Sequence, residues 1–204
     1  MQLASANTNR IVHKPLPFFL SESDPPAKQA ILTAALELFA TRGVDGVTIR
    51  DIAAETGFTN PAMFRHFKSK EELAQSLFEA CYRRLAHGFL QPDITLESVL
   101  ERGLALIEES PESVHFVTEN LRRYWHTLPA EVRAYSLLGS MRRLIEAEQR
   151  AGKVRQDADP DLAAAIVLGV LSQIARMAHF KELSKQPGAL AASLFNLINR
   201  GLGA

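Results

Sequence analysis

Residues Val47 to Leu73 read VTIRDIAAETGFTNPAMFRHFKSKEEL, and this stretch predicts two short helices joined by a tight turn, followed by the start of a third helix. Thr48 and Asp51 form a helix-start signature, because the hydroxyl accepts a free backbone N–H and the carboxylate lies at the positive end of the helix dipole. Gly57 tolerates the positive φ that commonly ends a helix. The first helix is therefore expected at about Ile49–Thr56.

A second helix is predicted from Asn60 to Phe67, with Thr59 as its cap and Pro61 in its first turn. Met63 and Phe67 are expected to point inward from one face of this helix. The opposite face combines polar, apolar and cationic side chains, which are the kinds that contact base edges and phosphates in the major groove of DNA. We therefore interpret the stretch as a DNA-reading helix-turn-helix, with these candidate DNA-binding residues: Thr48, Arg50, Thr59, Asn60, Pro61, Ala62, Phe64, Arg65, His66 and Lys70.

An ordinary helical hairpin with solvated cations is the alternative interpretation of this stretch. However, the run GFTNPAMFRHFKSKEEL at 57–73, together with TIRDIA at 48–53, resembles the signature of the TetR family of transcriptional regulators. This resemblance implies an all-α fold of about nine helices, with an N-terminal three-helix head that binds DNA and a C-terminal helical domain that binds a ligand and dimerises. In the family pattern the position of Phe64 is usually Tyr, whose hydroxyl holds a phosphate, and this chain lacks that hydroxyl.

The composition of the chain is that of a soluble globular protein, with 204 residues, 47% of them hydrophobic, and a formal net charge of zero. A zero net charge disfavours general nucleic-acid binding, but a local basic surface suffices for DNA contact because charges are screened beyond roughly 8 Å. The single cysteine, Cys81, excludes an internal disulfide and is expected to be a packed thiol in the helix LFEACYRRL. Both features fit a cytoplasmic protein.

Proline and glycine positions divide the chain into three predicted parts. Residues 1–23 have no helical period and no uninterrupted apolar run of the signal-peptide kind, so we expect an N-terminal arm that either lies along DNA or packs on the body. Residues 24–70 are expected to form the DNA-binding head. Residues 71–204 are expected to form the effector-binding and dimerisation domain, reached through a helix that starts at a Ser69–Glu72 capping box.

Further helices are predicted at about 95–109, from 110 onward, at 129–151, from 159 to 178 and at 189–200. The segment LAAAIVLGVLSQIARMA, at 162–178, is apolar on almost all sides, but its uninterrupted apolar run covers only half of the roughly 20 residues that a bilayer requires. We therefore expect no membrane span and a homodimer, with one side of this helix against its own domain and the other against a second subunit. The candidate dimer residues are Leu162, Ala165, Ile166, Gly169, Val170, Gln173, Leu190, Leu194, Leu197 and Ile198.

Sequence motifs give no support for catalysis, because HExxH, CxxC, GxSxG and phosphate-loop patterns do not occur. Glu112 and His115 make a single Glu-x-x-His, and the second such motif of a di-iron bundle is missing. We therefore predict no catalytic residue, no metal ligand and no cofactor. Ligand cavities of the TetR family lie among the central helices, and the resemblance implies these candidate ligand-binding residues: Phe89, His115, Phe116, Arg122, Tyr124 and Trp125.

The resemblance implies that the protein is a sequence-specific transcriptional regulator. It further implies a repressor, which leaves the DNA when it binds a small-molecule ligand. A twofold dimer presents two reading helices symmetrically, so the expected partner is a palindromic double-stranded DNA operator. One alternative is a TetR-like regulator whose C-terminal domain binds a partner protein or no ligand. A helical enzyme is a more remote alternative.

Overall fold

The computed structural model describes residues 20, 23–88 and 94–203, and every regular element among them is a helix. The predicted all-α class is therefore confirmed. The predicted N-terminal arm lies almost wholly outside the described residues, as does the ligand candidate Phe89.

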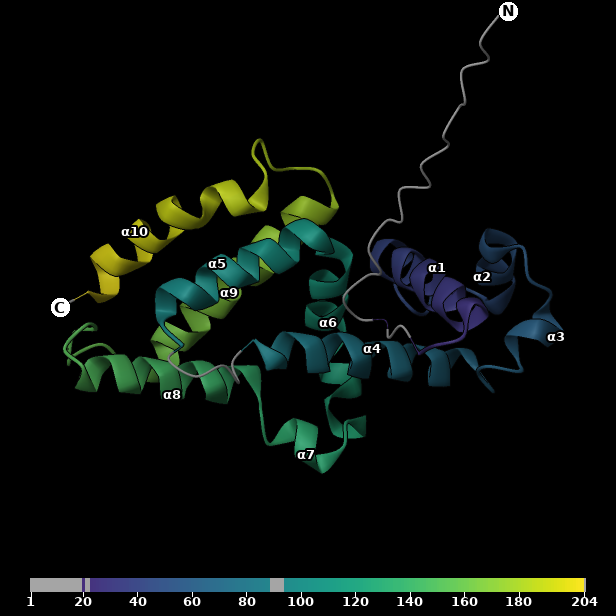
Figure 1. Ribbon diagram of the computed structural model, residues 1–204, viewed down its shortest axis with the longest axis horizontal. Coiled ribbons are helices and arrows are strands. Elements are labelled where there is room, and N and C mark those ends of the chain that lie inside the picture. The colour runs from purple at the N-terminus through teal and green to yellow at the C-terminus, as the bar shows by residue number, and fades with distance from the viewer. Residues whose placement is uncertain (1–19, 21–22, 89–93, 204) are drawn as a thin grey trace, which may run out of the picture.

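Three helices lie together at one end of the molecule, within the residues predicted to form the head, and a fourth helix leads from them toward the rest of the chain (Figure 1). Their bounds are α1 Pro26–Arg42, α2 Ile49–Thr56, α3 Asn60–Met63 and α4 Lys70–His87. The prediction that α3 continues to Phe67 is wrong. The backbone tightens after Met63, whose carbonyl accepts from the N–H groups of both His66 and Phe67, so the chain leaves the helix in a turn.

The C-terminal part consists of α5 Leu96–Glu109, α6 Pro111–Tyr124, η1 Trp125–Thr127, α7 Ala130–Arg133, α8 Leu137–Arg150, α9 Pro160–His179, η2 Pro187–Leu190 and α10 Ala191–Leu202. The single helix predicted at 129–151 is in fact two helices, α7 and α8. Ser136 begins the second one, because its hydroxyl accepts from the backbone N–H of Gly139 at 3.0 Å and caps the new helix.

Two hydrophobic cores hold these helices together, and helix α6 contributes to both. The first core joins α1, α2 and α4 to Phe116, Val117 and Tyr124 of α6, whereas the second joins α5, α8, α9 and α10 to Val114. Cys81 is fully buried in the first core, and burial raises the pKa of its thiol. The expectation of a packed thiol is therefore confirmed.

Helix α9 is buried on one side only. Ala164, Val167 and Ala175 face the second core, whereas Leu162 and Ile166 are 62% and 45% exposed. By length and mean hydropathy alone, α9 is apolar enough to cross a membrane. Its buried side is nevertheless packed against α5, α6 and α8, as expected for a core helix of a globular domain.

The dimer candidates on the last helix have two different environments. Leu194 and Ile198 are only 8% and 7% exposed and pack within the second core, which removes them from a surface that a partner could contact. Leu197 is 68% exposed on the other side of α10, and Leu190 precedes this helix in η2. Packing of α10 against α5 explains the difference, because α5 lies beside α10 along its length (Figure 1).

Lys70 fastens the loop between α1 and α2 to the start of α4. Its ammonium donates to the backbone carbonyl oxygens of Val44 and Val47, each at 2.7 Å. The side chain is half-buried, and both valines are buried. The structure therefore places this candidate DNA contact in the scaffold of the head, where it adds a donor to the Val44 carbonyl, which also accepts from the N–H of Val47, and supplies a donor to the Val47 carbonyl.

We expect Lys70→Met to lower the free energy of unfolding by about 1–3 kcal/mol, because the substitution leaves the Val47 carbonyl without its donor and removes one of the two donors to the Val44 carbonyl. Lys68→Met is the matched control, since Lys68 is an exposed neighbour with no ion pair in the described part of the chain, and it should change stability by no more than about 0.5 kcal/mol. Urea denaturation followed by circular dichroism measures both changes. Equal stabilities of the two variants would contradict the scaffold role.

Candidate nucleic-acid interface and internal cavity

The start of α2 is fixed by a reciprocal cap. The Thr48 hydroxyl accepts from the N–H of Asp51 at 3.2 Å, and the Asp51 carboxylate accepts from the N–H of Thr48 at 2.7 Å. These hydrogen bonds, with the nearby Arg42 guanidinium, hold the pKa of Asp51 below its usual range. The predicted helix-start signature is therefore confirmed, in the form of a reciprocal capping box, and the Thr48 side chain is committed to positioning α2.

Helix α3 and the turn after it present a mixed face to solvent. Met63 and Phe67 are buried as predicted, whereas Phe64 is 49% exposed on the other side. Arg65 is exposed and makes no ion pair among the described residues. The other candidates of this segment are exposed at Thr59 and Pro61 and half-buried at Asn60, Ala62 and His66.

Arg50 adds a second exposed cation on the first turn of α2, again without an ion pair in the described part of the chain. The head therefore exposes an aromatic ring and two unpaired guanidinium groups on the helices of the predicted reading motif. Guanidinium groups bind both phosphates and guanine edges, and an apolar ring can contact a thymine methyl. This arrangement has the chemistry of a DNA-contact face.

A cavity of about 780 Å³ lies between the end of α4 and helices α5, α6, α8 and α9. Its walls are mainly leucine, valine and isoleucine side chains, with Trp125 and Tyr82 among them. Two arginines and a histidine, namely Arg102, Arg122 and His126, also line it, and all three are exposed residues. The volume and the apolar walls are typical of a small-molecule site.

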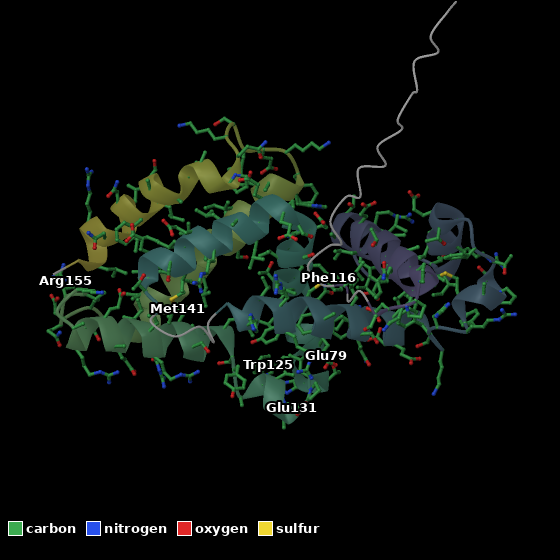
Figure 2. All side chains as sticks on the ribbon, viewed as in Figure 1. Glu79, Phe116, Trp125, Glu131, Met141 and Arg155 are labelled. Carbon is green, nitrogen blue, oxygen red and sulfur yellow. The ribbon has the colours of Figure 1, made fainter. Side chains whose placement is uncertain are left out.

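Only part of the predicted ligand set lines this cavity. Arg122 and Trp125 do, whereas His115, Phe116 and Tyr124 do not. Phe116, which is labelled in Figure 2, and Tyr124 are instead fully buried in the first core, because the inner face of α6 packs on α1 and α4. For these two residues, assignment to a ligand pocket is corrected to a role in the core.

Aromatic rings fill the junction between α1, α4 and α6. Phe116 stacks on Phe39 of α1 with ring centroids 6.0 Å apart and meets the edge of Phe78 of α4 at 6.5 Å. Tyr124 lies 5.4 Å from Phe78, and burial, with the Glu71 carboxylate nearby, raises the pKa of Tyr124 to about 12. The head is thus joined to α6 by a desolvated aromatic contact.

His115 lies at the edge of the same junction. Its ring is buried and stacks on His179 with centroids 5.2 Å apart, and Phe180 packs against it edge-on at 5.5 Å. Burial lowers the pKa of His115; the Glu119 carboxylate opposes this shift, and the Arg176 guanidinium adds to it. Within the residues that the structure describes, no group of three His, Cys, Asp or Glu side chains is placed to hold a metal ion.

Several cavity residues are absent from the predicted set, including Leu85, Arg102, Leu106, Leu171 and Ser172. The apolar stripe of α5 shows in the sequence, but helical periodicity does not distinguish a wall of a cavity from a packed core face. Gly169 also lines the cavity, although we expected it at a dimer interface. Gly169 is also exposed on α9, so its place at a dimer interface stays a prediction.

Arg123 provides a polar connection between α6 and the head. Its guanidinium donates to both carboxylate oxygens of Asp45 at 2.9 and 3.0 Å and to Glu71 at 2.9 Å. Asp45 lies in the loop after α1, and Glu71 lies in the first turn of α4. The adjacent residue in the sequence, Arg122, lines the cavity, so neighbouring residues of one helix contact the cavity and the head.

Comparison with known proteins agrees with this architecture. Residues 31–77 match the family model for bacterial regulatory proteins of the tetR family. The chain is 26% identical over 184 residues to the uncharacterized HTH-type transcriptional regulator YdgC of Bacillus subtilis, covering 86% of this chain and 92% of that protein. It is 28% identical over 148 residues to the HTH-type transcriptional repressor KstR2 of Rhodococcus jostii, covering 65% of this chain and 70% of that protein.

The fold is also similar to that of a solved structure. The ketosteroid transcriptional regulator KstR2 of Mycobacterium tuberculosis superposes with a TM-score of 0.77 at 18% identity, covering 92% of this chain and 99% of that chain. The family match lies on the helix-turn-helix, and the structural match extends through the C-terminal helices. The chain therefore carries a helix-turn-helix of the tetR-family type and shares the fold of a TetR-type transcriptional regulator over most of its length.

Proposed function

We propose that this regulator represses transcription in the cytoplasm as a homodimer bound to a palindromic operator, and that a small molecule in the cavity releases it. The observation that carries the proposal is the position of α6, which lines the cavity with Arg122 and holds the head with Arg123. A ligand that favours another position of α6 would change the head as well, because packed helices move as units. The relative from Rhodococcus jostii is named a repressor, and this name supports our proposal that the present protein represses transcription and does not activate it.

We assign DNA contact to the exposed part of the head. Phe64, Arg65, Asn60 and Arg50 are the residues proposed to reach base edges or phosphates, with Thr59, Pro61, Ala62 and His66 beside them on the same segment. Thr48 and Lys70 are proposed to act indirectly, because their side chains hold α2 and the preceding loop in place. The α3 helix is short, so its position depends on the rest of the head.

The dimer contact is assigned to the exposed side of α9 and to Leu197 of α10. Leu162, Ala165, Ile166, Gly169 and Gln173 are exposed on α9, and Val170 is half-buried beside them. Exposed apolar side chains at helical spacing are stabilised when a second copy covers them, by about 25 cal/mol for each Å² removed from water. A twofold axis through this face would pair α9 with its own copy.

Phe64 tests the DNA face. We expect Phe64→Ala to weaken operator binding by about 1–3 kcal/mol, because it removes an apolar contact at the bases, and Phe64→Tyr to keep or improve affinity by adding a phosphate hydrogen bond. Tyr135→Ala is the matched control, since Tyr135 is 47% exposed outside the head. The operator affinity of all three variants can be measured by fluorescence anisotropy, with an operator sequence enriched from random DNA. If Phe64→Ala unfolds the head, Phe64 is a core residue and the assignment to the DNA face is wrong.

Arg123 tests the connection between the cavity and the head. We expect Arg123→Gln to speed hydrogen exchange at residues 43–48 and at the start of α4, because the loop loses its tie to α6. The exposure of this ion-pair network limits the loss of global stability to about 1 kcal/mol. Arg83→Gln is the control, because Arg83 pairs with Glu79 and Glu131 on α4 and α7. The proposed connection between α6 and the head would be contradicted if hydrogen exchange in the head became faster in Arg83→Gln, or did not become faster in Arg123→Gln.

Ile166 tests the dimer surface. Ile166→Glu and Leu197→Glu should shift the protein toward monomer and reduce operator affinity, since a carboxylate would be buried without a partner at the interface. Tyr135→Glu adds the same charge away from α9 and α10 and should stay dimeric. Sedimentation equilibrium with parallel binding assays decides the matter. Gly169 is unsuitable for this test, because it also lines the cavity.

A further inference from the structure

The charge of the cavity points to the chemistry of its ligand. Among the described residues that line it are Arg102 on α5 and Arg122 on α6, and no described aspartate or glutamate does so. Neither arginine forms an ion pair with another described residue. The chain as a whole has equal numbers of acidic and basic residues, 23 of each. The cavity is therefore a locally cationic site in a molecule that has no excess of positive charge.

The placement of these charges divides the cavity into two parts. Arg102 and Arg122 are exposed, so their guanidinium groups border the cavity where it meets solvent. The remaining walls are mostly buried or half-buried apolar side chains, such as Val99, Val117 and Leu171. A charged group could not enter the apolar part without a large desolvation cost, whereas at the mouth it would stay partly hydrated.

A ligand that matches both parts has an apolar body and an acidic end. The apolar body fills the interior and gains from removal of its surface from water. An oxyanion at the mouth accepts charge-assisted hydrogen bonds, which a guanidinium group donates in pairs with fixed geometry. A cationic ligand of the same shape would be repelled, and a neutral one would gain nothing from the arginines.

We propose that the effector is an amphipathic acid, whose apolar body occupies the cavity and whose carboxylate or phosphate binds Arg102 and Arg122 at the mouth. This assignment rests on the proposed function of the cavity as the effector site and names the ligand class for it. His126, a third cavity residue that can donate a hydrogen bond, lies four residues after Arg122 and extends the same polar edge.

The chain carries its own reporter for this test. Trp125 is its only tryptophan, and it lines the cavity with its ring 5.7 Å from that of Tyr82. Tryptophan fluorescence of the full-length protein therefore reports on occupancy of this site. The probes are dodecanoate, dodecyl phosphate, methyl dodecanoate, dodecan-1-ol and dodecylamine, each titrated at pH 8 below the concentration at which it self-associates.

We expect at least one of the two anionic probes to bind about tenfold or more tightly than the ester and the alcohol, and the amine to bind most weakly. Comparison of dodecanoate with dodecyl phosphate shows which oxyanion the mouth prefers. Added NaCl should weaken the anionic probes and leave the ester unchanged, because only charge pairing is screened. Equal affinity of the ester, alcohol or amine, or no binding by any probe, would overturn the ligand class.

Substitutions assign the effect to the two arginines. Arg102→Met and Arg122→Met keep an unbranched apolar stem and remove the guanidinium charge, so each should reduce affinity for the preferred anion about tenfold and leave affinity for the ester intact. Arg150→Met is the matched control, since Arg150 is exposed on α8 and does not line the cavity. Loss of ester binding in the arginine variants as well would show a general disturbance of the cavity and contradict the assignment.

Operator binding, measured with the same probes, separates this inference from the proposed function. If a neutral probe binds as tightly as the acids and also releases the operator, the ligand class is wrong and the regulatory cavity stands. If the acids bind as expected but the operator stays bound, the ligand class stands and release by the cavity is wrong. Binding of an acid with release of the operator supports both.

Discussion

The aromatic contact between α6 and the pair α1 and α4 is the interaction on which the rest of this structure depends. Phe39, Phe78 and Phe116 come from these three helices and meet in a single buried cluster. Buried aromatic rings contribute a large apolar area and pack in specific geometries, so this contact defines how the head sits on the remainder of the chain. The helices of the head therefore have no separate hydrophobic core among the described residues, because α6 contributes side chains to the core that they share.

This sharing limits how the reading motif can be built. Helices α2 and α3 are too short to be stable alone, because helix formation in isolation requires about 12–15 residues. Ile52, Met63 and Phe67 anchor them to the core that α1, α4 and α6 complete. The exposed side of the motif is then free to hold residues that packing does not need, including Phe64, whose large exposed ring has no role in the core.

Local charge placement explains how a neutral protein can contain two cationic sites. Arg123, Arg83 and Arg176 are neutralised by carboxylates within the chain, whereas Arg50 and Arg65 on the head and Arg122 at the cavity have no such partners among the described residues. Because screening limits the reach of each charge, distribution matters more than the total. The net charge by itself therefore gave a poor indication of what this chain binds.

Much of the architecture was predictable because it depends on local signals. The cap at Thr48, the glycine after α2 and the proline at the start of α9 act within one turn of helix, so the starts of α2 and α9 were predicted to within about one residue. Local signals did not predict where α3 ends, at Met63, or where the chain breaks between α7 and α8, because the sequence at both places is also compatible with a continuous helix. At Ser136 a side-chain cap to Gly139 decided where the helix restarts.

The sequence by itself determined the all-α class, the helix-turn-helix and the resemblance to the TetR family, because helix periodicity, caps and a long ungapped motif are properties of neighbouring residues. Only the tertiary structure decided which side of α6 and α9 meets which partner. Periodicity defines an apolar face but not what covers it, so Phe116 and Tyr124 proved to be core, and Arg102 emerged as a cavity residue. Those outcomes depend on contacts between helices distant in the chain, which residue spacing does not encode.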